Sequence, residues 1–121
     1  MNIEKVAVLG ASDNPDRYSY KAFKMLLENN HKVFLVSPRL KEVEGHKVES
    51  SLKELSNIDT LTLYVNKSIS SSIIDEIIEL KPKRVIFNPG TENEELSLEL
   101  NKAGIQSEEA CTLVLLRNGQ F

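Results

Sequence analysis

Short apolar runs alternate with amphipathic segments along this 121-residue chain. Five of the runs are typical of buried β-strands, because consecutive apolar or β-branched residues are bounded by turn-forming residues. They span residues 6–9, 33–36, 61–65, 85–87 and, more briefly, 105–107. Ser37-Pro38 ends the second run, since proline cannot donate a hydrogen bond to a neighbouring strand.

Helical patterns fill the intervals between these strands. Residues 18–30 place Ala22, Phe23 and Leu26 on one face, and residues 69–80 carry a similar stripe of isoleucines before Pro82. A third helix is expected to end at Gly104. Residues 112–121 are compatible with either a strand or a helix.

Two pairs of residues have the spacing of a capping box. Ser51 with Glu54, and Thr91 with Glu94, place a hydroxyl three residues before a carboxylate. In a capping box, each of the two side chains accepts a hydrogen bond from the backbone N–H group of the other residue. Helices are therefore expected to begin at Ser51 and Thr91.

The alternation predicts a single α/β domain over residues 1–121, with a doubly wound, five-stranded parallel sheet and helices on both faces. Ligands of such sheets bind beyond the carboxyl ends of the strands, where the strand order reverses. Four loops therefore form the candidate site: residues 10–17, 37–41, 65–68 and 88–91.

Composition limits the classes of function. A net charge of −3 gives no basic field for nucleic acid or an anionic membrane surface, and no apolar run is long enough for a membrane span. The first residues lack the core of a signal peptide, and Cys111 is the only cysteine. A reducing cytoplasm fits this cysteine usage, and no metal site is predicted, since the glutamates near residue 95 resemble a solvated helix face.

The first loop has the features of a phosphate site. Gly10 permits a tight turn, so that Gly10, Ala11 and Ser12 can present backbone N–H groups and a hydroxyl to a pyrophosphate. A helix beginning near Tyr18 points its positive end into the same crevice, and Arg17 adds a charge. Only one of the three glycines of the dinucleotide fingerprint is present.

The second loop carries cations where NAD-binding proteins place an acid. Ser37, Arg39 and Lys41 suit a phosphorylated ribose, either the 3′-phosphate of coenzyme A or the 2′-phosphate of NADP, and a solvated basic loop is the alternative. Further candidates for ligand binding would form an apolar wall or make polar or backbone contacts. They are Pro15, Tyr18, Pro38, Asn66, Lys67, Asn88 and Gly90.

Taken together, the loops resemble those of the stand-alone coenzyme A-binding domain family, which is related to the nucleotide-binding half of the succinyl-CoA synthetase alpha subunit. The matching segments are Gly10-Ala11-Ser12 with Pro15 and Tyr18, Val36-Ser37-Pro38, Gly45, Val65-Asn66-Lys67, Gly90, Ala103-Gly104-Ile105 and Cys111. The resemblance implies a Rossmann-like domain that binds coenzyme A or an acyl-CoA.

No residue set indicates a reaction, so the sequence favours a binding module over an enzyme. His31 and His46 lie in separate regions, and a dyad of either with Cys111 is not favoured. Cys111 is expected to be an inert core residue, or else to form a mixed disulfide with the thiol of coenzyme A. The alternatives are an NADP- or NAD-binding redox module and a ligand-free interaction domain, and the tail allows a homodimer.

Overall fold

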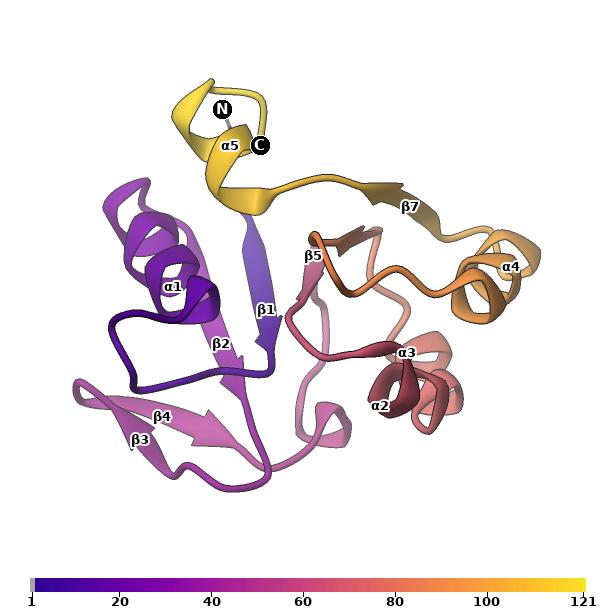
Figure 1. Ribbon diagram of the computed structural model, residues 1–121, viewed down its shortest axis with the longest axis horizontal. Helices are drawn as coiled ribbons and strands as arrows, with labels where there is room; N and C mark the ends of the chain where they lie inside the picture. The colour runs from indigo at the N-terminus through magenta and orange to yellow at the C-terminus, as the bar shows by residue number, and fades with distance from the viewer. Residues whose placement is uncertain (1) are drawn as a thin grey trace.

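A seven-stranded sheet organises residues 2–121, the part of the chain described by this computed structural model (Figure 1). The spatial order is β3-β4-β2-β1-β5-β6-β7. The strands are β1 (Lys5–Leu9), β2 (Lys32–Val36), β3 (Glu42–Val43), β4 (His46–Glu49), β5 (Thr60–Leu63), β6 (Arg84–Phe87) and β7 (Gln106–Glu109). All neighbours pair in parallel except β3 and β4, which are antiparallel.

The expected strands correspond to β1, β2, β5, β6 and β7, and the predicted number of five is wrong. A hairpin supplies the two additional strands, and β4 joins the sheet beside β2. Its turn contains Glu44 and Gly45, both with positive φ (49° and 82°), as a two-residue hairpin turn requires. Its strands are short and largely polar, so they lack the apolar run that marked the other strands.

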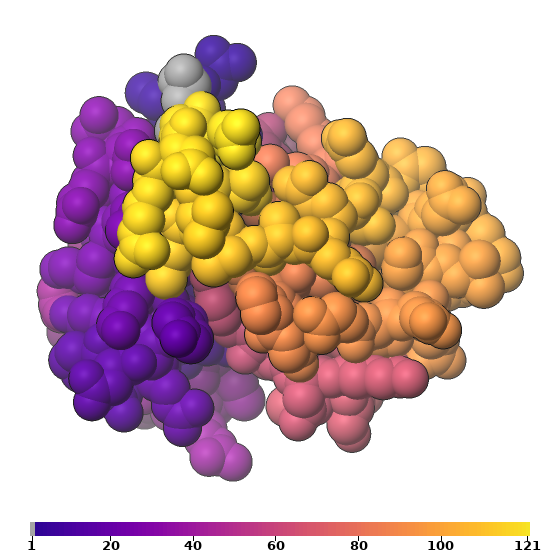
Figure 2. All heavy atoms as spheres, turned by 45° about the horizontal axis from the view of Figure 1, so that its top comes forward, coloured from indigo at the N-terminus to yellow at the C-terminus, as the bar shows by residue number. Residues whose placement is uncertain are grey.

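Helices cover both faces of the sheet, as predicted. One face carries α1 (Tyr18–Glu28) and α5 (Thr112–Arg117), and Figure 2 shows the C-terminal segment lying against α1. The other face carries α2 (Lys67–Ser71), α3 (Ile74–Leu80), α4 (Glu94–Lys102) and the 3₁₀ turn Leu52–Glu54. The tail is therefore helical, because Leu113 and Leu116 bury themselves against the sheet.

Alternate residues of each central strand feed two separate cores. Val6 and Val8 of β1 pack with Phe23 and Leu26 of α1. Ala7 and Leu9 of the same strand pack with α3 and α4 on the opposite face. Burying each large side chain contributes about 1.5–3 kcal/mol. Both faces of β1 are thus apolar, which explains its continuous run in the sequence.

The isoleucine stripe at 69–80 forms two helices instead of one. α2 ends at Ser71, and Ile73 leaves the helical conformation with φ −127° and ψ 24°. The Ser72 hydroxyl donates to the Ile69 carbonyl at 2.6 Å, which offers the backbone an alternative to continued helix. The apolar periodicity did not predict this break, because Ile77 is buried in the core on the far side of it.

Neither capping box forms as predicted. The Ser51 hydroxyl accepts from the Lys53 N–H group and donates to Glu76, so its partner is not Glu54. α4 begins at Glu94 and is capped by Asn93, while the Thr91 hydroxyl donates to the Asn88 carbonyl. The prediction that this helix ends at Gly104 is confirmed, since Gly104, with φ +76°, follows the end of α4.

Candidate ligand pocket at the carboxyl ends of the strands

A pocket of about 440 Å³ lies at the carboxyl ends of β1 and β5. β1 is followed through α1 by β2 on one side and is bordered by β5 on the other, so this is the point at which strand order reverses. Its lining comes from three loops: Gly10, Ala11, Ser12, Arg17, Tyr18, Ser19, Tyr64, Val65, Asn66, Pro89, Gly90 and Thr91.

Gly10 is required by the approach of two chain segments. Its φ is +93°, and a Cβ atom there would lie 2.6 Å from the Tyr64 carbonyl oxygen. The N–H groups of Gly10 and Ala11 both donate to the Val36 carbonyl, at 3.0 and 3.1 Å. The expected presentation of these two N–H groups to a pyrophosphate therefore does not match the structure.

The N-terminus of α1 faces the pocket without a side-chain cap. Arg17 is the N-cap residue in extended conformation, and no acidic residue occupies the first turn. Among residues 2–121, no acceptor is recorded for the N–H groups of Ser19 and Tyr20, and the first helical hydrogen bond runs from Lys21 to the Arg17 carbonyl. Free N–H groups, the helix dipole and a guanidinium together favour an anion.

Side-chain hydrogen bonds shape the loop before α1. The Ser12 hydroxyl accepts from the Asn14 N–H group, and the Asn14 side-chain oxygen accepts from Asp16, both at 3.0 Å. Pro15 is exposed and lies outside the pocket lining. Tyr18 lines the pocket and is 68% exposed, with the Lys21 ammonium 5.5 Å from its ring centroid. An accessible aromatic ring thus stands at the pocket's margin.

Residues 37–41 form a loop fastened at both ends by β4. The Ser37 N–H group donates to the Glu49 carbonyl at 3.0 Å, and Val48 donates to the Lys41 carbonyl at 2.9 Å. Inside the loop, the Arg39 N–H group donates to the Ser37 hydroxyl. Pro38, Arg39 and Lys41 are exposed and do not line the pocket. The loop nevertheless begins directly after Val36, whose carbonyl accepts the Gly10 hydrogen bond, so the start of the loop lies beside the first loop of the pocket.

Residues after β5 form the opposite wall. Asn66 lines the pocket and caps α2 by accepting from the Ile69 N–H group at 3.0 Å, whereas Lys67 is exposed and outside the lining. Tyr64 lies against the core beside α1, and burial raises its pKa to about 12. The phenol of Tyr64 therefore stays protonated.

Asn88 has a structural role instead of an accessible one. Its side chain is buried and donates to the Thr62 hydroxyl at 2.7 Å and the Leu63 carbonyl at 2.8 Å. Its oxygen accepts from the Thr112 N–H group at 2.9 Å. The amide therefore ties β6 to β5 and α5. Gly90 does line the pocket, where its N–H group donates to the Glu92 carboxylate at 3.1 Å.

The structure brings seven of the fourteen predicted ligand residues to the pocket: Gly10, Ala11, Ser12, Arg17, Tyr18, Asn66 and Gly90. Pro15, Ser37, Pro38, Arg39, Lys41, Lys67 and Asn88 lie outside its lining. Sequence reasoning missed Ser19, Tyr64, Val65, Pro89 and Thr91 as lining residues. The apolar run at 61–65 places Tyr64 and Val65 in a strand, whereas in the structure β5 ends at Leu63. Ending that strand earlier would have placed both in the loop.

Two further properties bear on the site. Within residues 2–121, histidine, cysteine, aspartate and glutamate side chains form no group of three or more placed to hold a metal ion. None of the helices in this described range has the length and apolarity to traverse a bilayer.

This geometry defines an α/β domain with a mostly parallel sheet and a pocket where the strand order reverses. A family model described as a CoA binding domain matches residues 4–117. The chain therefore belongs to the coenzyme A-binding domain family.

Three relatives of known sequence or structure are similar to this chain. The chain is 34% identical over 88 residues to the alpha subunit of acetate–CoA ligase [ADP-forming] II from Pyrococcus furiosus, covering 71% of this chain and 19% of the subunit. It is 29% identical over 102 residues to the uncharacterized protein YneT of Bacillus subtilis, covering 84% of this chain and 76% of YneT. A crystal structure of an uncharacterized protein matches with 40% identity and a TM-score of 0.95, covering 100% of both chains.

Proposed function

We propose that this protein binds coenzyme A or an acyl-CoA in the pocket at the carboxyl ends of β1 and β5, as a non-catalytic binding module. The uncapped N-terminus of α1 carries the proposal. Its open N–H groups and the Arg17 guanidinium converge on a pocket in a member of the coenzyme A-binding domain family. Free N–H groups at a helix start favour a phosphate, which this ligand supplies in its pyrophosphate.

The remaining contacts follow from the flanking loops. In this proposal Arg39 and Lys41 hold the 3′-phosphate, with Arg39 contributing more because a guanidinium binds two phosphate oxygens at once. Ser37 and Pro38 shape this loop. Pro15 and Tyr18 provide an apolar wall for the adenine or the pantetheine arm, and Asn66 with Lys67 offers polar contacts from the opposite side.

Cys111 is half-buried at the N-cap of α5, the helix that packs beside α1. A mixed disulfide with coenzyme A stays a prediction. Coenzyme A disulfide is the reagent that tests it: attack by the Cys111 thiolate would form the mixed disulfide and release one coenzyme A thiolate. Mass spectrometry of the treated protein should show an adduct that a reductant removes, and an unmodified Cys111 would reject the prediction.

We place the protein in a reducing cytoplasm on the basis of its single cysteine, with a small-molecule ligand and without nucleic acid as a partner. The same ligand chemistry admits NADP, because residues 37–41 suit any phosphorylated ribose. A homodimer built on the C-terminal segment stays an open proposal.

A thermal-shift panel with coenzyme A, acetyl-CoA, dephospho-CoA, NADP and NAD tests the assignment. A ligand at a hundredfold its Kd adds about 2.7 kcal/mol to the free energy of unfolding, which raises the midpoint by several degrees. We expect the largest shift with coenzyme A or acetyl-CoA and a smaller one with dephospho-CoA. A shift with NADP alone would assign a redox module, and no shift with any compound would leave an interaction domain.

A further inference from the structure

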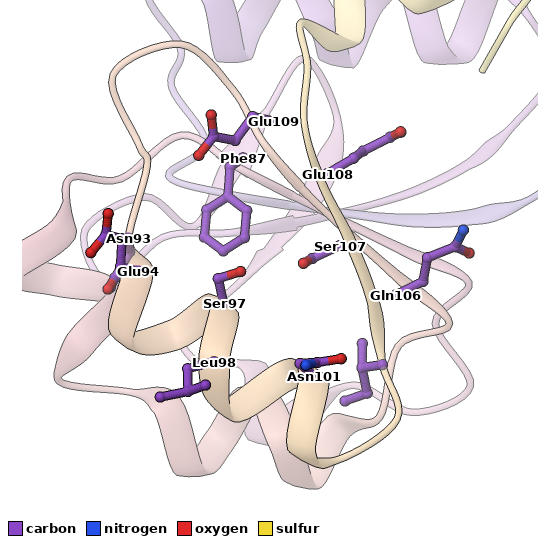
Figure 3. Close-up of a pocket in the computed structure, with 11 residues that line it drawn as sticks. Phe87, Asn93, Glu94, Ser97, Leu98, Asn101, Gln106, Ser107, Glu108 and Glu109 are labelled. Carbon is purple, nitrogen blue, oxygen red and sulfur yellow. The ribbon is translucent and has the colours of Figure 1, made fainter.

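A second, larger cavity lies away from the proposed ligand site. This groove, of about 650 Å³, runs between α4 and β7, the strand at one edge of the sheet (Figure 3). Phe87 and Ile105 contribute buried apolar surface to it, and the side chains of Ser97 and Ser107 stand on either side of the Phe87 ring in Figure 3. Short side chains on both walls leave room above an apolar floor.

The edge of β7 leaves backbone groups open. Ala110, one residue beyond β7, donates to the Phe87 carbonyl at 3.1 Å, so its N–H group points toward β6. Because successive residues of a strand point their N–H and C=O groups to opposite sides, those of Ser107 and Glu109 point away from the sheet. An edge with this arrangement is a template for one more strand.

The two edges of the sheet differ in this respect. β3, the opposite edge, has only two residues, and the turn after it is fastened to α1 by the Glu44 carboxylate, which lies 2.5 Å from the Lys24 ammonium. β7 has four residues, and the groove opens along its length. Only β7 therefore combines an open edge with space for side chains.

Charge defines what can occupy the groove. Glu94 and Glu109 line it, and Glu108 projects from the same strand, where it is 3.5 Å from Arg84. Antiparallel pairing of two β7 strands would bring glutamates of both copies together, which is unfavourable. A second copy of this chain is thus a poor occupant, and a cationic segment is a good one.

We propose that the groove between α4 and β7 docks an extended, cationic segment of a partner protein, which adds a strand to β7. Ser107 and Glu109 alternate onto the face of the sheet that α4 covers, since their pairing partners Val85 and Phe87 belong to that core. Side chains two residues apart in the added strand would therefore meet them. The preferred segment has a lysine or arginine near Glu94 and Glu109 and an apolar residue two positions away, above Phe87.

Amide chemical-shift mapping of the full chain tests this surface with two blocked hexapeptides, one alternating lysine and valine, the other alternating glutamate and valine. Saturable shifts at Ser107, Glu109 and the facing residues of α4 are expected with the lysine peptide and not with the glutamate peptide. Equal responses to both peptides, or shifts elsewhere, would overturn the proposal. So would a dimer of the chain formed through β7.

Two variants separate backbone pairing from groove filling. Ser107→Pro removes an N–H group that points away from β6 and so spares the pairing with β6; it should weaken the lysine peptide roughly tenfold. Ser107→Arg leaves the backbone intact but fills the groove and lowers its negative charge, with the same expected loss. An unchanged affinity in either folded variant would contradict strand addition. Unchanged amide shifts away from the groove in the free variants serve as the folding control, which does not depend on a ligand at the α1 pocket.

Discussion

The connections that follow β1 and β6 differ in what happens to their backbone N–H groups. Both contain a glycine with φ above 90° and lead into a helix at the carboxyl edge of the sheet. After β6, Asn93 caps α4 by accepting from Leu96, two glutamates occupy the first turn, and Gly90 donates to Glu92. After β1, α1 begins with Arg17 and no side-chain cap. Two connections with similar sequence features thus end in a satisfied helix start and an open one.

Only the open helix start suits an anion. Acids in the first turn of α4 repel a phosphate and already complement the dipole there. Arg17, a cationic N-cap residue that makes no capping hydrogen bond, forgoes about 1 kcal/mol of helix stability and leaves N–H groups open for a ligand. This difference is the reason why we propose the connection after β1, and not the one after β6, as the phosphate site.

The largest expected effect is the loss of stability when alanine replaces Gly10, compared with the same change at Gly90. Gly10→Ala should destabilise the fold by roughly 3 kcal/mol, because its Cβ atom would meet the Tyr64 carbonyl and the φ of +93° is unfavourable for alanine. Gly90→Ala has a φ of +91° but nothing within 4 Å of the added atom, so about 1 kcal/mol is expected. Urea unfolding of both variants measures the difference, and equal losses would refute the close-approach explanation for Gly10.

Asn88 tests the structural role of the connection after β6. Asn88→Ala should cost roughly 2–3 kcal/mol, because it leaves the buried Thr112 N–H group and the Leu63 carbonyl without this partner. Asn66→Ala, at an exposed helix cap, is the matched control and should cost about 1 kcal/mol. Thermal unfolding distinguishes them. A loss of ligand affinity with unchanged stability would mean that Asn88 contacts the ligand after all.

Arg39 tests the basic loop beside the open helix start. Arg39→Ala should weaken coenzyme A binding about tenfold while changing dephospho-CoA binding little, since only the former carries the 3′-phosphate. Titration calorimetry with both ligands gives the ratio. Lys53→Ala, an exposed cation in the 3₁₀ turn, controls for net charge. Equal weakening of both ligands would move the 3′-phosphate away from residues 37–41.

The smallest effect concerns the helix start itself. Arg17→Asp should cap α1 and raise the free energy of unfolding by about 0.5–1 kcal/mol, because aspartate accepts from the open N–H groups and complements the dipole. The same change should weaken coenzyme A binding by at least about tenfold, since it replaces a cation with an anion at the phosphate position. Denaturation and calorimetry on one sample measure both. A gain in affinity would reverse the assignment.

Apolar patterning predicted the sheet and its layers because β1, β2, β5 and β6 are buried and rich in Val, Leu and Ile. It missed the hairpin at residues 42–49, whose pairing depends on the Glu44-Gly45 turn and polar residues. The capping-box spacing missed that α4 begins at Glu94 with Asn93 as its cap, because the Thr91 hydroxyl has a competing acceptor in the Asn88 carbonyl.

The candidate site was predictable in position and less so in detail. The reversal of strand order follows from the alternation of strands and helices, and three of the four loops that it indicated line the pocket, whereas residues 37–41 do not. Hydrogen bonds between distant segments decided the rest. The Val36 carbonyl accepts hydrogen bonds from the N–H groups of Gly10 and Ala11. The buried Asn88 side chain bonds to the Thr62 hydroxyl and the Thr112 N–H group. Neither partner is near in sequence, so no local pattern indicated them.

Amide chemical-shift mapping with coenzyme A tests the central claim most directly. The open helix start predicts the largest saturable shifts at the N–H groups of Ser19 and Tyr20, with smaller ones at Ser12 and at residues 37–41. The N–H groups of residues 93–96, at the capped start of α4, should change little. Largest shifts at α4, or none at Ser19 and Tyr20 when the ligand saturates, would contradict the account.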